Sequence, residues 1–267
     1  MESRYTLGVS TEWDATSYHA VAAPQTSWGH AVLARLALDG AERVIDAGCG
    51  SGRLTAALLD RLPQGRVLAL DQSRNMLEVA RTNLRPVYGR RVGFVQAALP
   101  LVPVSGWADV VFSTATFHWI RDHSALFANL RVALRPAGRL HAQCGGGPNL
   151  AQAHALADAV MALPRFAPYF AGWPGVWEFA SAETTAVRLR EAGFVDIVTE
   201  VIAAPTTLAT EADYRAFVTT VIYHPHLGRL PETLRPGFLD EVTARAAVQS
   251  PPFTLDYWRL DMTATAA

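Results

Sequence analysis

The sequence predicts an α/β protein built on a doubly wound, mostly parallel sheet of seven strands. Between Arg43 and Cys144, short apolar runs alternate with stretches of helical periodicity, which is the pattern of consecutive βαβ units. A glycine-rich loop, 48–52, joins the first apolar run to a helix. Such a loop brings backbone N–H groups and a helix N-terminus close to a ligand, so we expect a binding site at this edge of the sheet.

The individual elements follow from apolar runs, capping residues and chain breakers. Strands are expected at 44–47, 66–71, 91–96, 108–112, 139–144 and 195–203, and an alternating pattern predicts a last, antiparallel strand at 253–263. Helices are expected at 24–38, 54–62, 76–84, 124–134, 150–163, 183–192 and 233–248, with one more beginning near Thr210. Arg85-Pro86 is expected to end the helix before it, and 135–138 to form the turn into the fifth strand.

The composition excludes several classes of protein. A formal net charge of −1 gives no electrostatic footprint for nucleic acid or for an anionic membrane surface. The cysteines, Cys49 and Cys144, are too few for a disulfide framework, and no apolar run approaches the roughly 18 residues that span a bilayer. The first residues lack the basic and apolar regions of a signal peptide. We therefore expect a soluble, cytoplasmic protein without nucleic-acid or membrane partners.

The spacing of the glycine loop indicates the kind of ligand. A dinucleotide fingerprint requires glycine three positions after Gly50, where this chain has Arg53, and the lysine of a P-loop is also missing. The loop instead has the pattern Asp-x-Gly-x-Gly-x-Gly, with Asp46 two residues before Gly48. A carboxylate at that place suits a ligand that carries a cation, such as an α-amino group. An ordinary glycine turn is the alternative for the loop taken alone.

A second acid strengthens the prediction of a nucleoside ligand. The next apolar strand ends at Asp71, 23 positions after Gly48. An acid about 20 residues beyond such a loop can accept hydrogen bonds from both ribose hydroxyls. Ser73 is a typical N-cap residue for the following helix, and Met76 lies on its first turn.

These motifs resemble those of the class I S-adenosylmethionine-dependent methyltransferases, and the resemblance runs from Arg43 to about Gly145. The segment from Ser113 to His123 is similar to the trans-aconitate 2-methyltransferase branch and its small-molecule relatives. The resemblance implies a Rossmann-like fold, S-adenosylmethionine as cofactor with S-adenosylhomocysteine as product, and methyl transfer to a small-molecule acceptor, including O-methylation of a carboxylate. The cofactor-binding residues that it implies are Asp46, Gly48, Cys49, Gly50, Asp71, Gln72, Met76, Ala97, Ala98, Leu99, Ser113 and Thr114, with Trp13 and Tyr18 from an N-terminal lid. The family usually has an acid shortly after the third strand, whereas this chain has Ala97-Ala98-Leu99 there and no acid.

The acceptor side is predicted from the end of the fourth strand and from the aromatic second half. His118 is a candidate general base or acceptor-binding group, and a structural histidine is the alternative. Other candidate acceptor-binding residues are Trp119, Tyr169, Trp173 and Arg165, and a carboxylate acceptor would also draw on Arg215 or Arg229. His224 and His226 straddle a proline without a carboxylate or cysteine at ligand spacing, so no metal site is expected.

The chain divides into six segments on this interpretation. They are an N-terminal lid and helix at 1–40, the cofactor-binding core at 41–147, a cap insertion at 148–182, a continuation of the core at 183–204, a second cap insertion at 205–250 and the last core strand at 251–267. Three other functions stay open: a non-catalytic nucleoside-binding protein, a natural-product O-, N- or C-methyltransferase with an apolar acceptor, and a nicotinamide oxidoreductase, which Arg53 disfavours. The oligomeric state is not predicted.

Overall fold

The computed structural model describes residues 23–267, and the predicted lid residues Trp13 and Tyr18 lie outside this range. Its main strands are β1 Arg43–Ala47, β2 Arg66–Asp71, β3 Val92–Gln96, β4 Ala108–Thr114, β5 Leu134–Gly145, β6 Phe194–Ala203 and β9 Trp258–Ala266, and a small sheet pairs β7 Thr206–Thr207 with β8 Thr254–Leu255. Its α-helices are α2 Ala23–Arg35, α3 Arg53–Asp60, α4 Arg74–Tyr88, α5 His123–Ala133, α6 Ala151–Met161, α7 Ala167–Phe170, α8 Ala182–Glu191, α9 Glu211–Phe217, α10 His224–Arg229 and α11 Arg235–Ala247. Short 3-10 turns are η1 Gly89–Arg91, η2 Phe117–Trp119 and η4 Glu232–Leu234, and η3 Val218–Ile222 is a π-helical turn.

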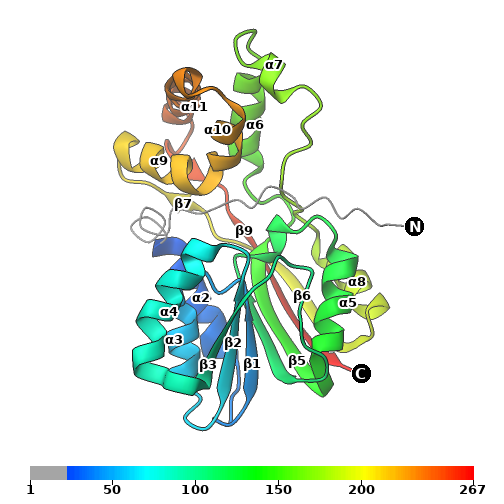
Figure 1. Cartoon of the computed structure of the whole chain (residues 1–267). Helices are drawn as coiled ribbons and strands as arrows, with labels where there is room; N and C mark the ends of the chain where they lie inside the picture. The colour runs from blue at the N-terminus through cyan, green and yellow to red at the C-terminus, as the bar shows by residue number, and fades with distance from the viewer. Residues whose placement is uncertain (1–22) are drawn as a thin grey trace, which may run out of the picture.

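The seven-stranded sheet has the order β3-β2-β1-β4-β5-β9-β6 (Figure 1). All neighbours from β3 to β5 are parallel, whereas β9 runs antiparallel between β5 and β6. The sequence therefore predicted the sheet correctly, including its antiparallel last strand. Strand order reverses between β1 and β4, and ligands of doubly wound sheets bind outside the carboxyl ends of the strands at such a point.

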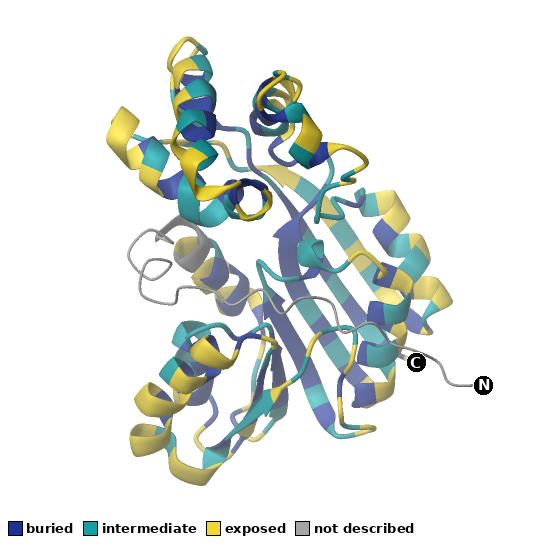
Figure 2. Ribbon diagram, turned by 45° about the horizontal axis from the view of Figure 1, so that its top comes forward, coloured by how far each residue is buried: buried dark blue, intermediate teal, exposed yellow. Residues whose placement is uncertain are grey.

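Two apolar clusters sandwich the sheet, because alternate residues of each strand face opposite sides. Val44 packs with buried residues of α2, α3 and α4, and its neighbour Ile45 packs with buried residues of α5 and α8. The middle strands are buried on both faces (Figure 2). The glycine loop thus follows a strand that is buried between the two helical layers.

A third apolar cluster forms a helical cap, which Figure 1 shows at the end of the sheet where β5 leads into α6. It combines buried residues of α6 and α7 with those of η3, α9, α10 and α11, so the stretches before α8 and after β6 pack on each other. Phe166, Tyr223 and Phe238 are fully buried at its centre. In the described part of the chain, no helix is long and apolar enough to cross a membrane.

Three predicted bounds were wrong. Helix α4 continues past Pro86 to Tyr88 and is capped by Gly89, whose N–H donates to the Arg85 carbonyl and whose φ is 57°. Strand β5 begins at Leu134 and absorbs the predicted turn at 135–138 as an irregularity in its pairing with β4. The last strand is broken at 256–257, because the chain there bonds to the start of α6: the Asp256 carbonyl accepts from the Leu150 N–H at 3.0 Å, and its carboxylate accepts from the Gln152 N–H at 2.9 Å.

Candidate functional site

A cavity of about 550 Å³ lies between the carboxyl ends of the parallel strands and the cap. The predicted site residues that line it are Gly48, Gly50, Asp71, Gln72, Met76, Ala97, Leu99, Thr114, His118, Trp119 and Trp173. These residues come from two parts of the fold: the glycine loop with its neighbouring elements, and the turn after β4 with the cap.

The carboxylate of Asp71 fastens the glycine loop to the end of β2. Its Oδ2 accepts from the Gly50 N–H at 2.9 Å, and its Oδ1 accepts from the Ser73 N–H at 2.9 Å. Each oxygen of an ionised carboxylate has a second lone pair. Asp71 also lines the cavity, so its carboxylate faces the space that a ligand would occupy.

The glycines of the loop are required for different reasons. Gly48 has φ +84°, and a Cβ there would lie 2.1 Å from the Thr116 Oγ1, so packing excludes a side chain. Gly50 has φ +53°, but a Cβ there would meet no heavy atom within 4 Å, because this residue lines the cavity. Open space at Gly50 allows a ligand to approach the backbone closely.

Asp46 does not line the cavity, contrary to the direct ligand contact that we expected. Its side chain is 2% exposed, and its Oδ2 accepts from the Thr55 hydroxyl at 2.6 Å. Burial is the main cause that raises the pKa of Asp46 from 3.8 to about 7, while the Thr55 hydrogen bond opposes the rise. The carboxylate therefore joins β1 to α3, where it holds the base of the loop.

Replacing Asp46 by asparagine should stabilise the ligand-free chain more at pH 8 than at pH 5. The pKa is higher in the folded state, so folded protein binds more protons than unfolded protein between pH 3.8 and 7, and wild-type stability falls as pH rises through this window. Asparagine still accepts from Thr55 but does not ionise. Thermal melting of both proteins, with Asp60→Asn as a surface control, should show a difference that widens by a few degrees, because one pKa unit is worth about 1.4 kcal/mol. A difference independent of pH would contradict this account.

Five more predicted residues do not line the cavity. The Ser113 hydroxyl is buried and donates to the Ala47 carbonyl at 2.6 Å, Cys49 is buried under the loop, and Ala98 is exposed. Tyr169 packs on the apolar cluster of the cap. Arg165 forms an ion pair with Glu241 and lies over the Phe166 ring, since α7 packs beside α11.

Of the remaining arginine and histidine candidates, some line the cavity and others do not. Arg215 pairs with Asp240 at 2.7 Å away from the cavity, whereas Arg229 lines it. His224 lines the cavity, while His226 is buried in the cap, where burial lowers its pKa to about 3. Within residues 23–267, no group of three or more His, Cys, Asp or Glu side chains is placed to hold a metal ion.

His118 is held with a defined tautomer. Its Nδ1 accepts from the Gly145 N–H at 3.3 Å, and its ring stacks on Phe179 with centroids 5.8 Å apart. Burial lowers the pKa of His118 well below 6.5, and the charge of Arg259 lowers it further. In the neutral ring the proton is then on Nε2, so His118 offers a hydrogen-bond donor and its remaining lone pair is already used.

The sequence did not identify Arg259, which lies on β9 directly opposite Gly145 and lines the cavity. Its side chain is 5% exposed, lies over Trp28 at 4.7 Å and donates from Nε to the Gln143 Oε1 at 3.4 Å. Alternation along the last strand places Arg259 opposite the apolar face, which predicts exposure to solvent. Helix α2 covers that face instead, and no sequence signal reports this.

Aromatic rings form the wall between η2 and the segment 174–181, which precedes α8. Trp119 and Trp177 have centroids 5.6 Å apart, and Trp177 stacks on Phe179 at 6.3 Å with an interplanar angle of 11°. The aromatic stretch from Phe166 to Phe179 could either line a pocket or attach the cap to the core. It does both, because Trp173, Trp177 and Phe179 line the cavity whereas Phe166 and Phe170 are buried in the cap.

Comparison with known proteins gives three findings. A methyltransferase domain matches residues 44–138. Trans-aconitate 2-methyltransferase of Azoarcus sp. (strain BH72) is 39% identical over 131 residues, which are 49% of this chain and about half the length of that relative. The enzyme of the same name from Paracidovorax citrulli (strain AAC00-1) is 29% identical over 85% of this chain and 86% of its own length.

A solved structure shares the fold. Haemonchus contortus phosphoethanolamine N-methyltransferase 2 in complex with S-adenosyl-L-methionine superposes with a TM-score of 0.60 at 18% identity, covering 94% of this chain and 56% of the other. The cavity fits such a ligand, since Gly50 leaves open space and Asp71 presents a carboxylate beside it. Residues 44–138 therefore form a methyltransferase domain, and the relatives together with the shared fold support S-adenosylmethionine as its cofactor.

Proposed function

We propose that this chain transfers a methyl group to a carboxylate oxygen of a small acid with an apolar body. The observation that carries the proposal is the buried guanidinium of Arg259 on a cavity wall that it shares with the neutral, Nε2-protonated ring of His118. Asp71 is the only acidic side chain among the described residues of the lining, and it belongs to the cofactor half. The acceptor half therefore contains a buried cationic side chain and, among its described lining residues, no acidic one.

The cofactor half is assigned to residues that the loop and strands β2 to β4 bring together. When bound, S-adenosylmethionine supplies an electrophilic methyl group. Asp71 would accept from its ribose hydroxyls, and Met76, Ala97 and Leu99 give apolar surface suited to the adenine ring. Close approach to the backbone at Gly50 would position the rest of the cofactor.

A carboxylate acceptor needs no general base. Its oxygen is already ionised near neutral pH, so the protein has only to hold it in line with the methyl group and away from water. Arg259 and the His118 Nε2–H would hold the oxygens. A phenol or an ammonium group would have to lose a proton, and His118 is not set up to remove it because its Nδ1 lone pair is occupied by the Gly145 N–H.

The rest of the acceptor half is apolar. Trp119, Trp177 and Phe179 line it, and so do Val221 and Ile222 from η3. The second arginine of the lining, Arg229, is exposed, lies over Trp173 at 5.6 Å and donates to the Tyr169 carbonyl at 2.9 Å. The relatives are named for trans-aconitate, which bears carboxylates. Here one buried cation among aromatic rings favours an acid with a single buried carboxylate.

Replacing Arg259 by methionine should raise the acceptor KM about tenfold or more, because a charged hydrogen-bond partner of the carboxylate is lost. Wild-type protein is first incubated with S-adenosylmethionine and a panel of aromatic and aliphatic acids, each paired with its amide and with the corresponding phenol or amine. S-adenosylhomocysteine and methyl ester are quantified by mass spectrometry. Lysine at position 259 should retain part of the activity.

The two roles of a cation at this place are distinguished by binding measurements. Affinity for S-adenosylhomocysteine should change less than twofold in the methionine variant. A large loss of that affinity would assign the guanidinium to the cofactor's own carboxylate. Methylated phenols or amines without any methyl ester would overturn the proposed acceptor.

A further inference from the structure

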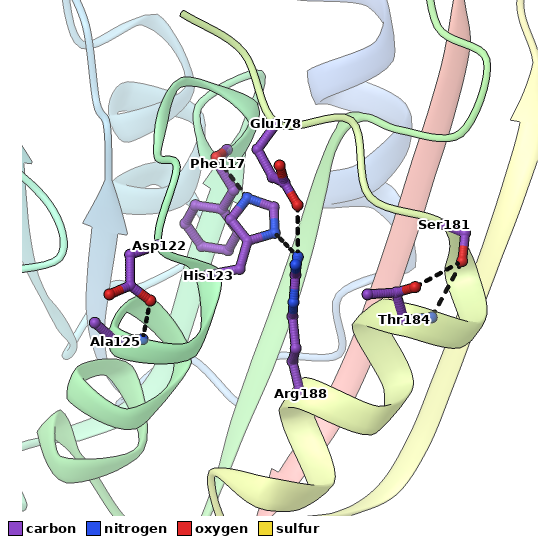
Figure 3. A network of polar contacts seen from close by, with 8 residues as sticks. All are labelled: Phe117, Asp122, His123, Ala125, Glu178, Ser181, Thr184 and Arg188. Atoms are coloured by element: carbon purple, nitrogen blue, oxygen red, sulfur yellow. Dashed lines mark hydrogen bonds and ion pairs between the residues drawn. The ribbon is translucent and has the colours of Figure 1, made fainter. Parts of the chain in front are cut away.

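Arg188 of helix α8 lies outside the cavity but connects two segments that line it (Figure 3). We propose that Arg188 is a positioning residue that holds the aromatic acceptor wall together through Glu178 and His123. This inference rests on the proposed function, since it concerns the acceptor half of the same cavity. None of the three side chains touches the cavity, so their effect has to be transmitted by the segments that they join.

The contacts of Arg188 determine the tautomer of His123. Its Nη1 donates to the Glu178 Oε1 at 2.9 Å and lies 3.3 Å from the His123 Nδ1. A guanidinium only donates, so Nδ1 is the acceptor and the proton of the neutral imidazole is on Nε2. That nitrogen lies 3.0 Å from the Phe117 carbonyl oxygen, which only accepts, so the assignment is consistent at both ends of the ring.

The connected segments carry the rings of the acceptor wall. Phe117 begins the turn η2, whose next two residues, His118 and Trp119, line the cavity. Glu178 lies between Trp177 and Phe179, which also line it. The Glu178 N–H donates to the His118 carbonyl at 2.9 Å, so the backbone of one segment is bonded to the backbone of the other beside the Arg188 contacts.

The burial of these groups makes the link hard to replace by water. His123 is 1% exposed, and the side chains of Arg188 and Glu178 are 25% and 31% exposed. Removal of Arg188 leaves a buried imidazole nitrogen without its donor and a half-buried carboxylate without its cation. The ring contacts His118–Phe179 and Trp119–Trp177 then lose the support that fixes one segment against the other.

The cofactor half is supported independently of this link. The loop is held by Asp71, by the Leu70 carbonyl, which accepts from the N–H groups of Gly48 and Cys49 at 2.8 and 3.0 Å, and by the Asp46–Thr55 pair. A change at Arg188 should therefore separate the two halves of the cavity: acceptor binding weakens while cofactor binding is kept.

The test uses Arg188→Met in the full chain, which keeps the aliphatic stem and removes the guanidinium. With the best acid of the panel, the acceptor KM should rise about fivefold or more, while calorimetric affinity for S-adenosylhomocysteine changes less than twofold. The matched control is Arg190→Met on the same helix, at an exposed position, which should leave both values unchanged. Arg188→Lys should recover part of the loss, because an ammonium still donates to one of the two partners.

Glu178→Ala gives a second route to the same link if Arg188→Met folds poorly. It should shift the acceptor KM in the same direction, and the double variant should add little, because both changes break one contact. An unchanged acceptor KM in both variants, or an equal loss of cofactor affinity, would overturn the positioning role.

Hydrogen exchange provides a readout that needs no acceptor. Amides in peptides covering 117–121 and 174–179 should exchange faster in Arg188→Met than in wild type or Arg190→Met, while peptides covering 46–55 should not change. If no acid is turned over but exchange rises only at these two segments, the proposed acceptor is wrong and the link is real. If acids are turned over but exchange at 117–121 and 174–179 is the same in Arg188→Met and in wild type, the positioning role of Arg188 is wrong and the proposed carboxylate acceptor stands.

Discussion

Replacing Gly50 by asparagine is expected to weaken the binding of S-adenosylhomocysteine by about 1,000-fold or more. A Cβ at Gly50 meets no heavy atom within 4 Å, because the space around it belongs to the cavity. A side chain at this position therefore occupies volume that the cofactor needs. Asparagine is chosen because it tolerates positive φ, and Gly50 has φ +53°. Isothermal titration calorimetry of the purified variant measures the loss.

The control for this variant is Gly106→Asn. Gly106 has φ +58° and open space around a Cβ, but it is exposed and lies outside the cavity lining. Both variants place asparagine at a similar positive φ, so their melting temperatures should fall by similar small amounts. Normal cofactor affinity in Gly50→Asn would show that the ligand does not approach the loop, and an unfolded variant beside a folded control would assign Gly50 a structural role.

The cofactor half was largely predictable, because its signals are local in sequence. A strand, a glycine loop and a helix occupy consecutive positions from Arg43 to Asp60, and Asp71 follows at the spacing of the next strand. Which member of the motif faces the ligand was less predictable. Asp46 and Ser113 lie on buried strands, where alternation turns successive side chains toward opposite faces of the sheet and only residues at the strand ends reach the cavity. That choice depends on register, which spacing alone does not give.

The acceptor half was only partly predictable, because it is assembled from residues far apart in the chain. Arg259 reaches the cavity because β9 is inserted between β5 and β6, and its neighbour His118 comes from a turn more than a hundred residues earlier. Trp177 and Phe179 were part of a recognised aromatic stretch, yet only packing against η2 distinguishes them from Phe166 and Phe170. Long-range pairing of this kind leaves no periodic signal in the sequence.

Asp71 is expected to support cofactor binding in two ways, by contacting the ligand and by holding the glycine loop. Asp71→Ala should therefore weaken cofactor affinity about 100-fold or more. The carboxylate holds the N–H groups of Gly50 and Ser73 at 2.9 Å each, and its remaining lone pairs are assigned to the ribose hydroxyls. Hydrogen bonds to a charged group contribute about 1.5–3 kcal/mol each, so loss of two ligand contacts alone accounts for this factor. Asp71→Asn should also bind the cofactor weakly, because the NH2 group of its side-chain amide would face a backbone N–H, which is also a donor.

Calorimetry with S-adenosylhomocysteine and with adenosine separates these contributions. If Asp71 binds the ribose, Asp71→Ala should lower the affinity for S-adenosylhomocysteine and for adenosine by a similar factor, because both ligands carry the same sugar. Asp60→Ala serves as the control, since that carboxylate accepts from the Tyr88 hydroxyl at 2.7 Å on the surface and does not line the cavity. Undiminished affinity of Asp71→Ala for both ligands would refute the ribose role, and with it the assignment of the nucleoside to this wall.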